Sequence, residues 1–511
     1  MTAHHLLPAR IQLLQELAHT YGTPLYVYDM PQIARNFTAF KQAFSGRKSL
    51  ICYALKANSN LSVLRLLAEL GSGADCVSIG EVRRALLAGI PAYKIIFSGV
   101  GKRDDEIKQA LELGILFINV ESFEELKRVE AIAKELAQEL ESKDQKLESS
   151  KDSLQKARIS IRVNPNIDPK THPYISTGLH ENKFGVDMDS AKQMYLYAHK
   201  SAFLEPIGIH FHIGSQLTEL EPLTQAARKI ADLARSLLAL GINLRFFDIG
   251  GGLGIRYEDE VPIDLYDYAQ GILGTLSGCD WTIVCEPGRR IVGDSGLLLT
   301  RVISQKHTES KRFVIVDAGM NDLMRPALYG AFHQPILLGY AEENSALGSH
   351  SGDFVDSMVF NKNAPSVASS QATGFAMRNR GFQGGGEGIY LGDNEQAPAA
   401  ESTIYRAKPT PKPSKAESSS EQPMPKADIV GPVCESSDTF CKNIALPPLH
   451  NGALLGFENA GAYGYSMAST YNARMRPAEV GIYADGARLI KSRESFEASV
   501  ADELALLDSS K

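Results

Sequence analysis

The sequence has no hydrophobic run long enough to cross a membrane and no excess of basic residues. Its 53 lysines and arginines stand against 60 aspartates and glutamates, and the net charge of −7 argues against a dedicated nucleic-acid surface. The first ten residues, MTAHHLLPAR, lack the apolar core of a secretory signal. We therefore expect a cytoplasmic protein that binds neither membranes nor nucleic acid.

Cysteine is also scarce, with six residues spread along a chain of 511. None of them have the spacing of metal ligands, and without a secretory signal the simplest expectation is reduced thiols. The sequence therefore predicts no metal site, and most of the cysteines are expected to be small core residues. They are Cys52, Cys76, Cys279, Cys285, Cys434 and Cys441.

The sequence does contain a repeated pattern of short apolar runs that alternate with longer amphipathic stretches. Such alternation is typical of βα units around a buried parallel sheet. Eight repeats over roughly 250 residues indicate a closed (β/α)8 TIM-like barrel, with a doubly wound open sheet as the alternative. The eight runs begin at Leu50, Ala74, Lys94, Leu116, Ile159, Ile207, Arg245 and Thr282.

The barrel is predicted to span residues 35–295, with a charged helical extension at about 134–156. Beyond it the βα alternation stops, and residues 296–343 and 427–511 read as a mostly antiparallel β domain. A helix and the strand PLYVYD, within residues 1–34, are expected to join that β domain.

Residues 344–426 differ in composition from both predicted domains. They are rich in Ser, Gly, Asn, Lys and Pro. Such a segment cannot bury enough apolar surface to offset the entropy lost on ordering. We predict a disordered insertion.

Unusual polar residues and glycines stand at or just after the ends of the apolar runs. Because active sites of such barrels are built at the carboxyl ends of the strands, these residues are expected to meet in one site. They are Lys56, Asp75, Ser98, Arg162, His212, Gly250 to Gly252 and Glu286.

Three of these features suit one cofactor. Lys56, in YALKAN, ends an apolar run, and partial burial would lower its pKa and favour a Schiff base, although a lone lysine there is more often an ordinary surface residue. The glycines of DIGGGLG suit a phosphate, and Glu286, in EPGRR, could keep a ring nitrogen protonated. Together these demands indicate pyridoxal 5′-phosphate.

In HFHIGSQ, the alternation sends His210 and His212 to the same side of a strand. An imidazole there could stack on a cofactor ring or carry protons. Ser215, three residues after His212, could donate a hydrogen bond to a phosphate.

Nine motifs in one order resemble the diaminopimelate decarboxylase family, in the alanine-racemase-like barrel group of pyridoxal-phosphate enzymes. The resemblance runs from about Tyr21 to Ile490, apart from the two insertions. YALKAN is shared by the wider decarboxylase group, whereas MRPALY and GPVCES point to diaminopimelate. The motifs are YALKAN, GADCVSIGE, RVNPNIDPKTHPYISTGLHENKFG, HFHIGSQ, DIGGGLG, EPGR, MRPALYGA, GPVCES and ENAGAYG.

The resemblance implies decarboxylation of meso-2,6-diaminopimelate to L-lysine and CO2 through an external aldimine, the last step of lysine biosynthesis. It implies Lys56, His212 and Cys434 as catalytic residues, with Cys434 at the proton-donor position. The implied substrate-binding residues are Arg289, Arg325, Tyr329, Glu435 and Tyr463. The implied cofactor-binding residues are Lys56, Asp75, Arg162, His212, Ser215, Gly251, Gly252, Glu286, Gly288, Arg289 and Tyr463.

The resemblance also implies a homodimer, because in this family the residues matching Cys434 and Glu435 enter the site from a second subunit. Two departures from the family pattern stand out. Ile79 replaces a frequent glycine in GADCVSIGE, and the long insertion ends directly before GPVCES.

Three other functions remain open on the sequence alone. An ornithine- or arginine-type decarboxylase of the same fold would replace the Arg325, Tyr329, Cys434 and Glu435 set by a more acidic amine pocket. A catalytically inactive regulatory paralogue would have no need for Lys56. A scaffold protein would use residues 344–426 as its working part.

Overall fold

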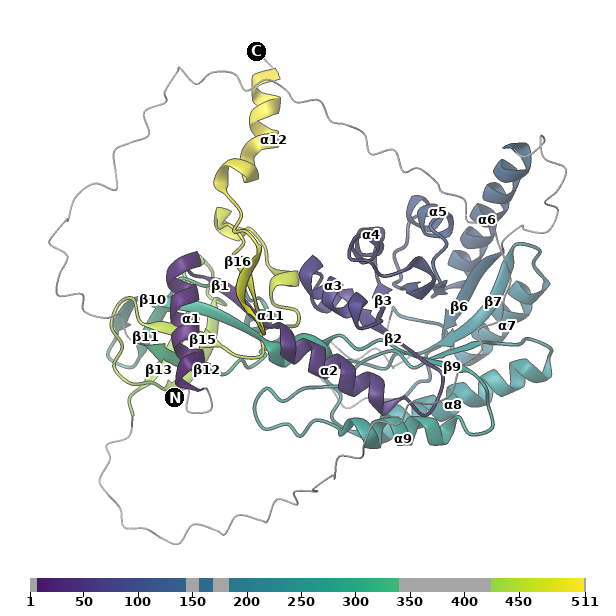
Figure 1. Ribbon diagram of the computed structural model, residues 1–511, viewed down its shortest axis with the longest axis horizontal. Helices are drawn as coiled ribbons and strands as arrows, with labels where there is room; N and C mark the ends of the chain where they lie inside the picture. Colours follow the sequence, from purple (N-terminus) through teal and green to yellow (C-terminus); the bar gives the residue numbers. More distant parts are fainter. Residues whose placement is uncertain (1–6, 144–155, 169–182, 340–423, 510–511) are drawn as a thin grey trace, which may run out of the picture. The chain divides into compact units, whose positions relative to one another are not determined.

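The computed structural model describes residues 7–143, 156–168, 183–339 and 424–509 (Figure 1). All but the last three residues of the predicted insertion, 344–426, lie outside these ranges, as does most of the predicted helical extension, 134–156. Within the described ranges, no helix combines the length and the apolar character needed to cross a lipid bilayer.

Eight parallel strands form a closed barrel in which each strand pairs with the next and the last pairs with the first. Each strand coincides with one of the eight predicted apolar runs. The predicted barrel is therefore confirmed, and the open-sheet alternative is wrong. The strands are β2 (Ser49–Ala54), β3 (Gly73–Cys76), β4 (Ile95–Phe97), β5 (Phe117–Val120), β6 (Ala157–Arg162), β7 (Leu204–His210), β8 (Phe246–Asp248) and β9 (Thr282–Cys285).

Helices surround the barrel strands (Figure 1). They bury apolar side chains in the main core, as amphipathic helices do. Side chains at several helix starts accept hydrogen bonds from free backbone N–H groups, as Ser78, Asp187 and Asp264 do. The helices are α2 (Met30–Ala43), α3 (Leu61–Glu69), α4 (Ile79–Leu87), α5 (Asp104–Glu112), α6 (Phe123–Lys143), α7 (Met188–Lys200), α8 (Leu220–Ala239) and α9 (Leu265–Thr275).

The remaining strands form a nine-stranded sheet in which six of the eight pairings are antiparallel. This confirms a mostly antiparallel β domain beside the barrel. The strands are β1 (Leu25–Asp29), β10 (Gly296–His307), β11 (Arg312–Val316), β12 (Pro335–Gly339), β13 (Lys426–Val430), β14 (Thr439–Ala445), β15 (Leu454–Phe457), β16 (Ala478–Tyr483) and β17 (Gly486–Lys491).

Strand β1 lies inside this sheet, antiparallel to β10 and parallel to β16. Its residues Leu25 and Val27 pack with helix α1 (Pro8–Tyr21) in a small apolar core of their own. Three further helices belong to this part of the chain or lead into it. They are α10 (Arg289–Val292), α11 (Arg325–Tyr329) and α12 (Phe496–Ser509), the last of which contributes no buried residue.

The segment after β15 lies against the barrel turn that carries Lys56. The N–H of Tyr463 donates to the carbonyl oxygen of Ala57 at 2.8 Å, and Asn58 donates to the carbonyl oxygen of Gly461 at 3.3 Å. Gly461 is packed so closely that an added Cβ would lie 1.8 Å from the carbonyl oxygen of Val292. The absence of a side chain at Gly461 therefore sets how the β domain meets the end of the barrel.

This packing makes Gly461→Ala a sensitive substitution. The new methyl group would force the two backbones apart, and we expect the free energy of unfolding to fall by about 2 to 3 kcal/mol in urea denaturation. Gly274→Ala is the matched control, because Gly274 is exposed in α9 and has no atom within 4 Å of the added Cβ. That change should leave stability equal or raise it by about 1 kcal/mol, and equal losses in both variants would contradict the close contact.

Candidate active site

A cavity of about 750 Å³ opens at the carboxyl ends of the barrel strands, and residues of the β domain complete its wall. A smaller pocket of about 70 Å³ adjoins it and is lined in part by Gly251, Gly252 and Gly288. The larger cavity gathers most of the predicted site residues. These are Lys56, Asp75, Arg162, His212, Ser215, Glu286, Arg289, Arg325, Tyr329 and Tyr463.

Lys56 stands in the turn directly after β2 and reaches into the cavity with 41% of its side chain exposed. Its Nζ lies 3.3 Å from Oδ2 of Asp75, which is fully buried at the end of β3. Burial on its own would lower the pKa of Lys56, but the Asp75 carboxylate, with Tyr463 and Glu286, outweighs it and raises that pKa. The expected net lowering of the pKa of Lys56 is therefore wrong, although the expected effect of burial is present.

Ile79, one of the two departures noted in the motifs, opens helix α4, and its side chain packs against the main core. Its N–H donates to Oε1 of Glu106 at 3.2 Å. The contact between Asp75 and Lys56 is present in this chain with Ile79 in place.

Glu286 follows β9 and is buried at the inner end of the cavity beside His210 and Asp248. Burial raises the pKa of Glu286, but His210, whose Nε2 lies 3.3 Å from Oε2, and Lys56 together lower it to about 2. Burial and the charge of Glu286 raise the pKa of Asp248. Glu286 is thus an ionised carboxylate, and its Oε1 has no hydrogen-bond partner within the described ranges.

Arg162 is held at the cavity wall by Glu121, which sequence reasoning missed. Its Nη1 lies 3.3 Å from both carboxylate oxygens of Glu121. The same carboxylate accepts from the N–H groups of Gly99 and Gly185, both at 3.1 Å. Glu121 therefore joins the loops after three neighbouring strands to the guanidinium group.

His212 lies next to the glycines of DIGGGLG. Its Nδ1 accepts a hydrogen bond from the N–H of Gly251 at 3.2 Å, and burial, then Arg162 and Lys56, lower its pKa well below the usual value. The imidazole is therefore neutral with its proton on Nε2. A Cβ at Gly251 would lie 2.1 Å from the carbonyl oxygen of Glu286, so only glycine permits this close approach.

Arg289 and Arg325 are both 6% exposed, and neither pairs with an Asp or Glu side chain in the part of the chain that the structure describes. Arg289 donates to the hydroxyl oxygens of Tyr257 at 2.6 Å and Ser215 at 3.1 Å. Its guanidinium also lies 4.9 Å from the ring centre of Tyr463, a residue with φ of +58°. Two buried positive charges without acidic partners favour the binding of anions next to these two arginines.

Cys434 and Glu435 line neither the larger cavity nor the smaller pocket beside the glycines. Both are exposed, and the N–H of Cys434 donates to Oδ1 of Asn472 at 2.8 Å. The described part of one chain therefore does not bring these two residues to Lys56.

Sequence reasoning also missed the roles of Tyr257 and His333. His333 stands two residues after the end of the motif MRPALYGA, so its position was a signal. Tyr257 lies in a loop after the glycines, where nothing in the sequence marks it. His210 was noticed through its alternation with His212, but its contact with Glu286 was not.

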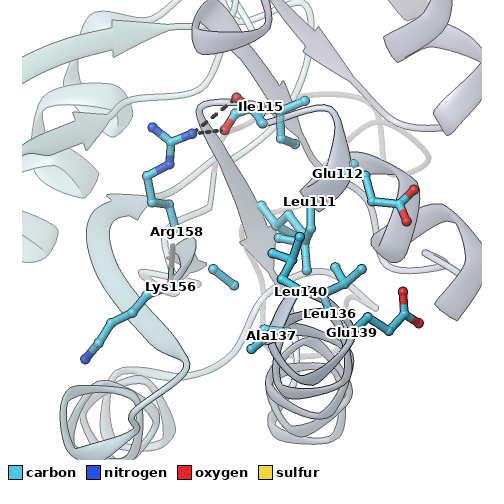
Figure 2. A pocket seen from close by; sticks show the side chains of 14 residues that line it. Leu111, Glu112, Ile115, Leu136, Ala137, Glu139, Leu140, Lys156 and Arg158 are labelled. Atoms are coloured by element: carbon cyan, nitrogen blue, oxygen red, sulfur yellow. Dashed lines mark hydrogen bonds between the residues drawn. The ribbon is translucent and has the colours of Figure 1, made fainter. Parts of the chain in front are cut away.

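A second cavity, of about 330 Å³, lies at the amino ends of β5 and β6, opposite to the end that carries Lys56. Figure 2 shows its leucine-rich wall, with Leu111, Leu136 and Leu140, and the side chain of Arg158. Arg158 is already bonded to the carbonyl oxygens of Gly114 and Ile115. No predicted site residue lines this cavity, so the chemistry belongs to the larger one.

Comparison with known proteins agrees with this geometry. Residues 30–293 match the family described as "Pyridoxal-dependent decarboxylase, pyridoxal binding domain", and residues 379–461 match its "C-terminal sheet domain". The chain is 50% identical to a diaminopimelate decarboxylase of Helicobacter pylori strain J99, over 94% of this chain and 96% of that protein. It is 45% identical to one of Campylobacter jejuni, over 96% of this chain and 98% of that protein.

A solved structure is similar over nearly the whole chain. The crystal structure of diaminopimelate decarboxylase from Helicobacter pylori complexed with L-lysine matches with a TM-score of 0.75 and 48% identity, covering 96% of this chain and 99% of that one. The chain therefore belongs to the pyridoxal-dependent decarboxylases and, within them, to the diaminopimelate decarboxylase family.

Proposed function

We propose that this chain binds pyridoxal 5′-phosphate and converts meso-diaminopimelate to L-lysine and CO2, using the residues of the larger cavity. The observation that carries the proposal is that one cavity holds Lys56 and two buried arginines, Arg289 and Arg325, neither of which pairs with an Asp or Glu side chain in the described ranges. A relative with 48% identity is described in complex with L-lysine, the expected product.

The residues present fit the cofactor. Among the described residues that line the cavity, Lys56 is the one lysine. Its amino group is therefore the one that would bind the aldehyde of the cofactor. The unpartnered Oε1 of Glu286 suits a protonated ring nitrogen, and the pocket beside Gly251, Gly252 and Gly288 suits the phosphate. When bound, the cofactor supplies an electron sink for the pair left behind as CO2 departs.

Three side chains around the proposed cofactor position differ in charge. Glu286 stays ionised because His210 and Lys56 stabilise its carboxylate. Asp75 keeps Lys56 protonated at Nζ, which leaves a proton at the end of the side chain that faces the cavity. His212 is neutral, and its ring is held in place by the hydrogen bond from Gly251. It is therefore suited to pack against the cofactor ring without adding a charge next to it.

Arg289 lines both the larger cavity and the smaller pocket, so it is suited to bind an anion next to the glycines. Arg325 lines only the larger cavity. We assign the distal carboxylate of the substrate to Arg325, with Tyr329 beside it. A guanidinium group binds a carboxylate through paired N–H donors. Ornithine lacks this carboxylate and would leave the buried charge of Arg325 unpaired, which penalises it strongly.

Cys434 and Glu435 are proposed to act in the cavity of a second subunit. Both are exposed and lie outside the cavity of their own chain, which fits a contribution made across a dimer interface. Glu435 would pair with the distal ammonium group of the substrate, and Cys434 would stand near the carbon that is protonated after CO2 leaves.

The first test measures lysine and CO2 from meso-diaminopimelate, with ornithine in parallel, for the cofactor-loaded protein. Arg325→Met should lower kcat/KM for diaminopimelate by about 100-fold or more, because the distal carboxylate loses its partner. Arg256→Met is the control, since Arg256 is exposed on the loop beside the cavity. Turnover of ornithine in preference to diaminopimelate would overturn the assigned substrate.

The second test concerns Lys56. In Asp75→Asn the group that raises the pKa of Lys56 is gone while burial remains, so that pKa should fall by about one unit or more. Cofactor is added to the cofactor-free protein, and the growth rate of its visible absorbance band is measured as a function of pH. The midpoint of this pH profile should lie at a lower pH in Asp75→Asn than in the parent protein. Asp280→Asn, on the exposed pair with Lys48, is the control, and Lys56→Ala should give no covalent band. An unchanged midpoint in Asp75→Asn would contradict the pairing.

The third test concerns the shared site. Lys56→Ala and Cys434→Ala are each expected to be nearly inactive. If Cys434 acts across a dimer, unfolding and refolding the two together should restore about a quarter of the activity, because half of the randomly formed dimers hold one intact site. A mixture as inactive as its components would place Cys434 in the site of its own chain.

A further inference from the structure

We propose that His333 is a positioning residue for Arg325: it fixes the guanidinium group without neutralising it, and so sets the preference for a substrate with a distal carboxylate. This inference rests on the proposed function, because it assumes that Arg325 binds that carboxylate.

The hydrogen bonds of His333 leave one arrangement of its proton. His333 is 1% exposed, its Nε2 lies 2.8 Å from Nη1 of Arg325, and its Nδ1 lies 2.9 Å from the carbonyl oxygen of Glu458. A guanidinium group only donates and a carbonyl oxygen only accepts. Nδ1 therefore carries the proton and donates to Glu458, and the lone pair of Nε2 accepts from Arg325.

The charge of the imidazole agrees with this arrangement. Burial first, and then the neighbouring Arg325, lower the pKa of His333 to about 3. A proton on Nε2 would face the guanidinium N–H directly, and both groups would be positive. His333 therefore remains a neutral acceptor at every pH at which the enzyme would work.

Tyr257 holds the same guanidinium group from another side. The guanidinium carbon of Arg325 lies 4.7 Å from the ring centre of Tyr257, and the ring of His333 packs edge-on against Tyr257 at 5.5 Å. The hydroxyl oxygen of Tyr257 accepts from Arg289 at 2.6 Å. The ring of Tyr257 thus lies against both arginines, Arg289 and Arg325. Of these two arginines, His333 is hydrogen-bonded to Arg325 only.

The choice of a neutral partner has a chemical consequence. An aspartate or glutamate at this position would hold Arg325 as firmly, but it would also compensate its charge and compete with an incoming carboxylate. An imidazole acceptor supplies direction without a counter-charge. The buried charge of Arg325 is therefore left for the ligand, and binding of an anion repays part of its desolvation cost.

The experiment compares three substitutions of His333 with His307→Leu, a control at an exposed histidine of β10. His333→Leu removes the acceptor, His333→Gln keeps an acceptor near the position of Nε2, and His333→Glu adds a counter-charge. In the cofactor-loaded protein we expect His333→Leu to raise KM for diaminopimelate about tenfold or more, with kcat within about threefold of the parent. His333→Gln should recover most of this loss, and His333→Glu should bind the substrate more weakly than His333→Leu.

A second readout does not depend on turnover. Calorimetry on the cofactor-free protein would measure binding of pimelate, which has two carboxylates, and of hexanoate, which has one. We expect His333→Leu and His333→Glu to weaken pimelate binding about tenfold or more while hexanoate binding stays within about threefold. The cofactor absorbance band should be unchanged in every variant that retains the fold.

The outcomes separate this inference from the proposed function. Equal losses for pimelate and hexanoate, or a fall in kcat without a rise in KM, would show a merely structural role for His333 and overturn the inference. If the parent protein does not turn over diaminopimelate, the proposed function fails, while a selective loss of pimelate binding in His333→Leu would still support His333 as the residue that positions Arg325.

Discussion

The site depends on two positive charges that the protein buries without neutralising them. Arg289 and Arg325 are nearly inaccessible, yet their neighbours in the described ranges are hydroxyl groups, aromatic rings and a neutral imidazole. Such neighbours orient a guanidinium group but leave most of its charge uncompensated. Anionic ligands are then the groups that complete the electrostatics of the cavity, and affinity for them follows from the cost of keeping these charges buried.

The opposite charge gathers at the inner end of the same cavity. Asp75 and Glu286 line it from the ends of barrel strands, and Lys56 with His210 keeps Glu286 ionised. The arginines come from α10 and α11, outside the barrel strands. The two functions therefore come from different parts of the fold. The strand ends surround the position suited to the cofactor. The segments that follow the barrel supply the arginines suited to the carboxylates of the substrate. Gly461 lets these two parts approach closely.

Much of this arrangement could be predicted because it depends on local pattern. The period of apolar runs predicts the barrel, and a closed parallel barrel brings the ends of its strands together, so Lys56, Asp75, His212 and Glu286 had to meet. The direction of the shift in the pKa of Lys56 could not be predicted, because it depends on a 3.3 Å contact with Asp75 that outweighs burial. Burial and nearby charge act in opposite directions, and only their distances decide the result.

The sequence by itself determined the barrel, the residue types at its strand ends and the motifs of the decarboxylase family. Tertiary structure alone decided what His333 does, because its two partners, Arg325 and the carbonyl oxygen of Glu458, are eight and 125 residues away along the chain. It likewise decided that Cys434 and Glu435 lie outside the cavity of their own chain. Periodicity and motifs report on neighbours along the chain, whereas hydrogen-bond direction and charge compensation depend on side chains that only folding brings together.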